Sequence, residues 1–331
     1  MVKVESSLSG EFFCEVKKGD KVVRSYPVTK NLILNQGLNS RGVKGGYLSD
    51  SSRDSDSYFN WRYCGVGTGN SEPLVTQTSL DTPIAKVKAP FTDYIGDSVL
   101  AENGIFKSKV VSVFEFYGLE GNNITELGLY ANGYYKYNPS IAAYSVLATR
   151  ALIKDAEGNA TSITLLEDEI LVVTYTVTVH INTVVAPSVI NVIDRDGNLE
   201  PYNVETIITN LSAKNISPIR GFTGDNNTSG VGYNDKIFDY TPLESAPVHT
   251  YLPYRKTPVV SPYVVDSFEQ EIYMFFPISE ANNDLKYISM GTSSHPTFIF
   301  KISKVSDGSP LTKTGNETLK IPMLMKWGRK E

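Results

Sequence analysis

The feature of this chain that most constrains its fold is a strand pattern that occurs twice. The segments 163–177 and 311–325 carry three matching residues at the same spacing, namely Thr164, Glu169 and Leu171 in the first and Thr312, Glu317 and Leu319 in the second. Beyond them, apolar side chains occupy every second position up to Val177 and Met325. Because successive side chains of a strand point to opposite faces, each segment predicts a turn followed by a long strand with one apolar face.

The repetition and the composition together predict two tandem β domains. A chain of 331 residues is long enough to bury two cores. It contains 20 Tyr and 14 Phe but only 2 Trp, and aromatic residues suit the half-buried surface of a sheet. We therefore expect a mainly β fold of two antiparallel β-sandwich-like domains with short helical turns and long loops. The first domain is expected at 1–185, and the second, a diverged repeat of the first, at 186–331.

Further segments recur in the same order in the second half. Three pairs match, namely 112–118 with 271–277, 123–127 with 283–288, and the hairpin before the long strand with 298–308. The glycine-rich turn at Gly65–Gly69 is expected to survive only as Gly221–Gly224, and Gly230–Gly232 is expected to form another turn.

Three local structures are predicted in the first half. Residues 9–27 form a hairpin about the turn residues Lys18-Gly19-Asp20. A helical turn within 31–36 ends at Gly37, and residues 143–154 pair with the long strand 169–181.

Net charge and cysteine content exclude several classes of partner. The net charge of −5 gives no general attraction to nucleic-acid phosphates. The two cysteines, Cys14 and Cys64, lie in separate strand-like segments and are expected to be buried free thiols, with one disulfide as the alternative, and to hold no metal. The start of the chain lacks the apolar core of a signal peptide, and no stretch is apolar enough to span a membrane. We expect the chain to fold in a cytoplasm and to need no cofactor.

No motif predicts a catalytic, cofactor or metal site. Gly65–Gly69 is not followed by the helix or the Lys-Ser/Thr pair of a phosphate-binding loop. The acidic segment 194–200 lacks the spacing of a calcium loop and predicts a hairpin turn instead. His180, His249 and His295 lack metal-ligand spacing. The chain is accordingly expected not to be an enzyme, although a pair of carboxylates acting on polysaccharide leaves no local signature.

Tyrosines are the candidates for contact with partners. Five occur close together around Asn-Pro and Asn-Gly turns, namely Tyr130, Tyr134, Tyr135, Tyr137 and Tyr144, and two more lie in a proline-bounded segment, Tyr251 and Tyr254. Tyrosine buries a large area while keeping a hydroxyl for hydrogen bonds, which favours it at interfaces. The alternative is that these side chains cover a small β core.

The order of motifs in the first half resembles a known group of proteins. The motifs are Asn-Leu-Ile-Leu-Asn-Gln-Gly at 31–37, Tyr-Cys-Gly-Val-Gly-Thr-Gly-Asn-Ser-Glu-Pro at 63–73, Thr-Ser-Leu at 78–80, Ile-Thr-Glu-Leu-Gly-Leu-Tyr at 124–130, Ser-Val-Leu-Ala-Thr-Arg-Ala-Leu-Ile at 145–153, and Glu-Ile-Leu-Val-Val-Thr-Tyr-Thr-Val at 169–177. Over residues 9–180 the chain resembles virion proteins of tailed bacteriophages, of the tail, tail-fibre or baseplate-associated class. The second half departs from this pattern, since the Thr-Glu-Leu-Gly strand has lost its Glu and Gly.

The resemblance implies a non-enzymatic structural subunit of a phage tail, such as a collar, baseplate or fibre-anchoring adaptor. Its partners would be other tail proteins and copies of itself, and its location the tail or neck of a virion assembled in the bacterial cytoplasm. It implies no catalytic residue. The alternative is a receptor- or glycan-binding module of a tail fibre, in which Tyr134, Tyr135 and Tyr137 would stack on a host surface glycan.

Overall fold

The computed structural model describes residues 2–42, 60–89, 95–100, 103–133, 144–193, 196–209, 229–232, 254–256, 259–290 and 297–330. These ranges are mainly β, which confirms the predicted fold class, and most of their strand pairs are antiparallel. They contain one short helix, α1 (Asn35–Gly42). No helix among the described residues is long and apolar enough to span a membrane.

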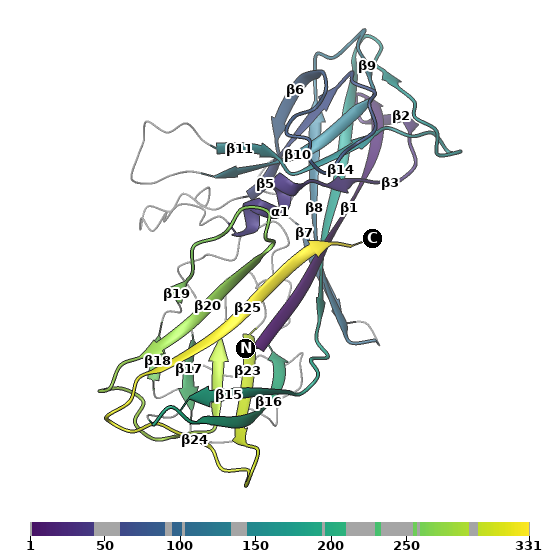
Figure 1. Ribbon diagram of the computed structural model, residues 1–331. Coiled ribbons are helices and arrows are strands. Elements are labelled where there is room, and N and C mark those ends of the chain that lie inside the picture. Colours follow the sequence, from purple (N-terminus) through teal and green to yellow (C-terminus); the bar gives the residue numbers. More distant parts are fainter. Residues whose placement is uncertain are drawn as a thin grey trace.

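The largest sheet in the described part of the chain contains strands from both halves (Figure 1). Its strands follow the order β19 (Val259–Val260), β20 (Glu269–Phe276), β25 (Leu319–Arg329), β1 (Val2–Lys18), β14 (Glu169–Asn182), β8 (Ile105–Phe116) and β7 (Ile95–Leu100). Two short strands also pair with β1, namely β2 (Lys21–Ser25) and β3 (Thr29–Lys30). The predicted hairpin of β1 and β2 is confirmed, with Gly19 in its turn at a φ of 58°.

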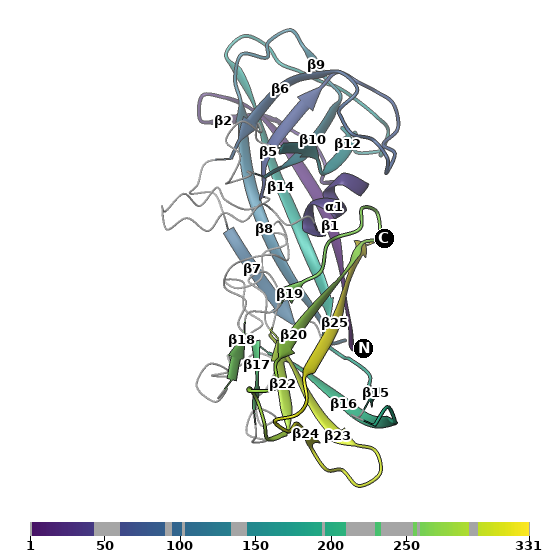
Figure 2. The same cartoon turned by 60° about the vertical axis from the view of Figure 1, so that its left-hand side comes forward.

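Each half adds a second sheet, and the two second sheets lie at opposite ends of the molecule (Figure 2). In the first half the order is β4 (Leu32–Ile33), β12 (Thr149–Leu152), β10 (Glu126–Gly133), β5 (Asn60–Gly67) and β6 (Pro83–Lys88), and β11 (Tyr144–Leu147) also pairs with β10. In the second half the order is β15 (Ser188–Ile193), β16 (Leu199–Thr209), β23 (Thr297–Lys304), β22 (Tyr287–Met290), β17 (Ser229–Gly232) and β18 (Tyr254–Lys256). Two small sheets complete the fold, β9 (Asn123–Ile124) with β13 (Ile163–Thr164), and β21 (Asp284–Leu285) with β24 (Leu311–Thr312).

The two copies of the strand pattern have equivalent pairing partners. β14 pairs antiparallel with β8, so that Leu171 lies opposite Phe116. β25 pairs antiparallel with β20, so that Leu319 lies opposite Phe276. The short pair β9–β13 corresponds in the same way to β21–β24, and β10–β12 corresponds to β22–β23.

The same side-chain hydrogen bonds occur in both copies. The threonine that precedes each long strand donates to a side-chain oxygen on the neighbouring short strand, Thr164 to Asn123 over 2.6 Å and Thr312 to Asp284 over 2.7 Å. The matching glutamates accept from the backbone N–H three residues earlier, over 2.8 Å at Glu169 and 2.7 Å at Glu317. The glutamate bond closes the turn that starts each long strand, and the threonine bond ties that turn to the neighbouring short strand, which accounts for the shared Thr and Glu.

The strand pairs also correct the predicted glycine motif of the second half. Gly67 of β5 lies opposite Glu126 of β10, and Gly232 of β17 lies opposite Tyr287 of β22. The Cys-Gly-Val-Gly sequence of β5 therefore corresponds to Ser-Gly-Val-Gly in β17. The prediction of a turn at Gly230–Gly232 is wrong, and the segment proposed as the counterpart, 221–224, lies outside the described residues.

Strand β1 joins the two copies. Its residues Ser6–Lys18 pair antiparallel with β14, and its residues Val2–Leu8 pair parallel with β25 on the other edge. β14 and β25 therefore run in opposite directions, and equivalent strands follow one another outward on both sides of β1. An approximate two-fold axis through β1 describes this arrangement. The sheet crosses the boundary expected at 185/186, and the division into two domains stays a prediction.

Two local predictions are wrong for identifiable reasons. Helix α1 continues through Gly37 to Gly42. Gly37 is needed for close packing, because a Cβ there would lie 2.3 Å from the carbonyl oxygen of Ala148. The segment 144–152 pairs with β10 and β4 rather than with the long strand β14, whose two edges are covered by β1 and β8.

Candidate functional site

A buried carboxylate holds the loop 68–82 of the first half. Glu126 on β10 has no exposed surface. Its oxygens accept hydrogen bonds from the backbone N–H groups of Gly69 at 3.1 Å, Asp81 at 3.1 Å and Thr82 at 2.8 Å. Buried N–H groups are costly to leave unpaired. The carboxylate therefore fixes both ends of the loop against the sheet.

Arg150 on β12 provides the counter-charge to this carboxylate. Its side chain is fully buried, and its Nε donates to Glu126 at 2.8 Å. The other guanidinium nitrogens donate to Asp81 at 2.7 Å, Gln77 at 2.9 Å and Ser71 at 3.3 Å. The hydrogen bond from Ser71, together with Arg150, holds the pKa of Asp81 below its usual range. Hydrogen bonds thus satisfy both charges, as a buried ion pair requires.

This network gives a structural account of part of the motif order. Ser71, Glu126 and Arg150 come from three of the motifs that carry the resemblance to phage virion proteins. In the second half, the strand pairs place Tyr287 and Ile299, both buried, where the first half has Glu126 and Arg150. Neither of these side chains is charged, so the second half has no ion pair at these two positions, and the two copies differ in how their second sheets are held.

The two halves also differ at a strand edge. In the first half, residues 13–16 of β1 pair with residues 171–174 of β14. In the second half, β25 pairs with β1 only from Met323 onward. Residues 319–322 of β25 pair with β20 on one side and with no described strand on the other. We call this edge, with the cavity beside it, the open seam.

An apolar cavity of about 330 Å³ lies beside this edge. Its lining comes from both sheets of the second half and from the start of β1, and includes Val2, Ile190, Val204, Ile288, Phe300, Leu319 and Ile321. Leu171 and Val173 in the first half are fully buried, whereas their equivalents Leu319 and Ile321 are half-buried. The second half thus leaves apolar surface uncovered where the first half buries it.

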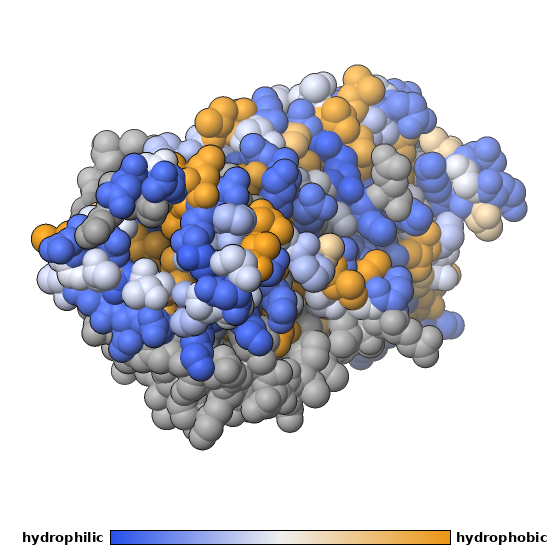
Figure 3. All heavy atoms as spheres, turned by 60° about the horizontal axis from the view of Figure 1, so that its bottom comes forward, coloured by the Kyte–Doolittle hydropathy of each residue, from blue (hydrophilic) through white to orange (hydrophobic). Residues whose placement is uncertain are grey.

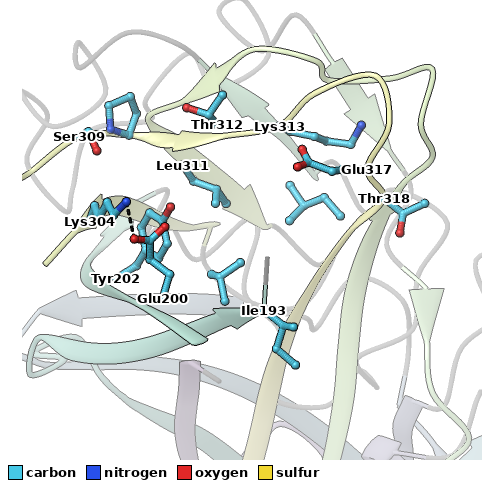
Figure 4. A pocket seen from close by; sticks show the side chains of 13 residues that line it. Ile193, Glu200, Tyr202, Lys304, Ser309, Leu311, Thr312, Lys313, Glu317 and Thr318 are labelled. Carbon is cyan, nitrogen blue, oxygen red and sulfur yellow. Dashed lines mark ion pairs between the residues drawn. The ribbon is translucent and has the colours of Figure 1, made fainter. Parts of the chain in front are cut away.

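A second pocket of about 280 Å³, which we call the mouth, shares Ile193, Leu311 and Leu319 with the cavity and has a more polar lining (Figure 4). Leu311 lies within this mouth, and Glu200 and Lys304 form an ion pair at one side of it. The hydrogen bond to Glu200 raises the pKa of Lys304. Across the mouth, the Nζ of Lys313 donates to Asn282 at 2.6 Å. The open seam therefore combines an apolar cavity with charged groups in the mouth that shares its lining.

β15, the edge strand beside the open seam, exposes apolar side chains. Val189 and Ile193 are 60% and 69% exposed, and Leu199, opposite Ile193, is 64% exposed. Figure 3, which views the molecule from this end, shows apolar groups interspersed on a largely hydrophilic surface. Single exposed apolar residues are ordinary on a monomer, but these adjoin an uncovered strand edge, which is the part of a sheet most prone to pair with another chain.

The structure describes the side chain of one predicted interface tyrosine. Tyr130 is half-buried and packs against a small cluster of Leu34, Leu80 and Leu147. The Nζ of Lys86 lies 4.1 Å from the centre of its ring, and burial raises the pKa of Tyr130 to about 12. These contacts fit the alternative that it covers a local core, and its role at an interface stays a prediction.

The other predicted tyrosines lie outside the described side chains. Tyr134, Tyr135, Tyr137 and Tyr251 are outside the described residues, and Tyr144 and Tyr254 are described only as the first backbone positions of β11 and β18. The interface prediction for these six residues stays untested. The open seam was missed from the sequence, because Leu319 and Ile321 have the same apolar alternation as the buried residues of the first copy.

Of the three histidines, His180 lies in the described part of the chain, and His249 and His295 lie outside it. The Nε2 of His180 is 2.9 Å from the Oγ of Ser9. Burial, together with Lys107, Lys330 and Lys109, lowers the pKa of His180 to about 4. This histidine is therefore neutral near pH 7.

The described residues contain no group of His, Cys, Asp and Glu side chains arranged to hold a metal ion. Cys14 and Cys64 are buried free thiols, as predicted. No protein-family model matches the chain, and no curated protein or solved structure shows significant similarity to it.

Proposed function

We propose that this chain is a non-enzymatic structural subunit that acts by assembling with other proteins, and that its assembly is the tail of a bacteriophage. The observation that carries the assembly role is the open seam, where an apolar cavity adjoins a strand edge that has no described partner. The order of motifs over residues 9–180 supports the phage tail as the setting.

The difference between the two copies supports an adaptor. A symmetric pair of copies would present the same surface twice. Here one copy is closed by β1, whereas in the other residues 319–322 have no described strand on that edge and exposed apolar residues lie nearby. A subunit of this kind presents two different surfaces, which suits a position between two different neighbours.

The test is the protein composition of purified particles of the phage that encodes the chain. Quantitative mass spectrometry is expected to find the chain at a fixed copy number relative to the major tail protein, and to find it retained after the particles are washed at high salt. Absence from the particles, or loss on washing, would overturn the proposal. Turnover of host polysaccharide by the isolated chain would count against a purely structural role.

A further inference from the structure

The first half shows what fills the position that is open in the second. Residues 13–16 of β1 lie along residues 171–174 of β14, in antiparallel register. The side chains of Cys14 and Val16 point into the core and are fully buried there. Phe13 and Glu15, which alternate with them along the strand, lie on the outer face. One extended segment thus covers the strand edge and fills the core with every second side chain.

The second half has the same edge and the same core position, but no described strand there. The alternating residues Leu319 and Ile321 correspond to Leu171 and Val173, and the cavity of about 330 Å³ lies next to them. β1 already pairs with β25 from Met323 to Arg329. A strand placed along residues 319–322 would therefore continue, on the same edge of β25, the pairing that β1 begins at Met323.

We propose that the open seam accepts an extended segment of a neighbouring subunit as an added β-strand. The segment pairs with the N–H and C=O of Lys320 and with the C=O of Pro322, which has no N–H to donate. Its alternate side chains, which are aliphatic, enter the cavity. Its polar flank meets the charged mouth at Glu200, Lys304 and Lys313. A small apolar molecule would fill the cavity but leave the strand edge unpaired, whereas a strand satisfies both.

The identity of the partner as a neighbouring subunit rests on the proposed assembly function, whereas the binding of an extended strand does not. A test on the isolated chain therefore separates the two. The first half supplies the probe, since its own strand fills the equivalent position. We specify a synthetic peptide with the sequence of residues 11–18, Cys14→Val to prevent oxidation, and a fluorophore at its end.

Binding is measured by fluorescence anisotropy, and its location by hydrogen exchange of the backbone amides. The peptide is expected to bind and to slow exchange of the Lys320 amide. Lys320 is the residue of 319–322 with an N–H on the open edge, because alternate positions of β25 such as Trp327 donate towards β20 and Pro322 has no N–H. The substitution Ile321→Lys places an ammonium group in the apolar seam and is expected to weaken binding about tenfold or more. The matched control is Ile278→Lys, at a 54% exposed apolar residue outside the seam, which should leave binding unchanged.

A second arm changes the peptide and leaves the chain intact, in case Ile321→Lys impairs folding. A peptide with lysine at the two alternate positions that match Cys14 and Val16 is expected not to bind. The proposal is overturned if the first peptide fails to protect the Lys320 amide at millimolar concentration, or if the lysine peptide binds equally well. Either result leaves the virion composition test unaffected.

Discussion

Replacing Arg150 by methionine tests whether the buried ion pair holds the first half together. Arg150 has no exposed side-chain surface, and it is the cationic partner of Glu126, which is equally buried. Methionine keeps much of the volume and removes the charge. Glu126 would keep its three backbone N–H donors but would remain an anion in the core without a cation. Breaking a buried pair in this way costs about 3–5 kcal/mol.

The chain provides a matched control in the pair of Arg24 with Glu169. Arg24 lies at the edge of the sheet with 37% of its side chain exposed, and water can replace it as a partner. Glu169 itself is buried, but it keeps the N–H of Leu166 as a donor when Arg24 is removed, so the loss is expected to lie near the upper end for exposed pairs, about 1 kcal/mol. Arg24→Met is therefore expected to destabilise the chain much less than Arg150→Met, although each substitution removes one arginine from one glutamate.

The assay is urea unfolding of both variants and of the unmodified chain, with the free energy of unfolding obtained by linear extrapolation. Hydrogen exchange of the loop 68–82 adds a local readout, because Glu126 and Arg150 both bind that loop. Faster exchange is expected there in Arg150→Met and not in Arg24→Met. Equal destabilisation by the two substitutions would refute the reasoning, since it would mean that burial of the pair does not determine its contribution.

Three further outcomes are expected. Gly128→Ala should destabilise the chain by about 1–3 kcal/mol in the same unfolding assay, because the added Cβ would lie 2.2 Å from the backbone oxygen of Thr149. Gly328→Ala is the control and should be nearly neutral, because a Cβ there meets nothing within 4 Å. The pKa of His180 is lowered to about 4, so its contribution to stability is complete above its ordinary pKa and is lost as the pH falls from about 6.5 to about 4. The free energy of unfolding measured across that window should therefore depend less on pH in His180→Gln. Burial raises the pKa of Cys14 and Cys64, so a thiol reagent should label them only after denaturant is added, and rapid labelling of the native chain would contradict their burial.

Much of the local structure follows from short-range pattern. The hairpin of β1 and β2 is encoded by Gly19 between two apolar runs, and the shared Glu closes the turn before each long strand by accepting from the N–H three residues earlier. The role of Gly37 could not be predicted in this way, because its close approach to Ala148 joins segments that are distant in sequence. The counterpart of the Gly65–Gly67 strand segment was likewise found only through its pairing with β22.

The sequence alone determined that residues 171–177 and 319–325 are strands with one apolar face, because alternation is a property of neighbouring residues. It could not determine which of those faces would be covered. Leu319 and Ile321 are as apolar as Leu171 and Val173, but their burial depends on whether a strand from a distant part of the chain lies beside them. Tertiary structure decided which segment is covered, because β1 pairs with residues 171–174 of β14 whereas its pairing with β25 begins at Met323, so residues 319–322 have no described strand on that edge.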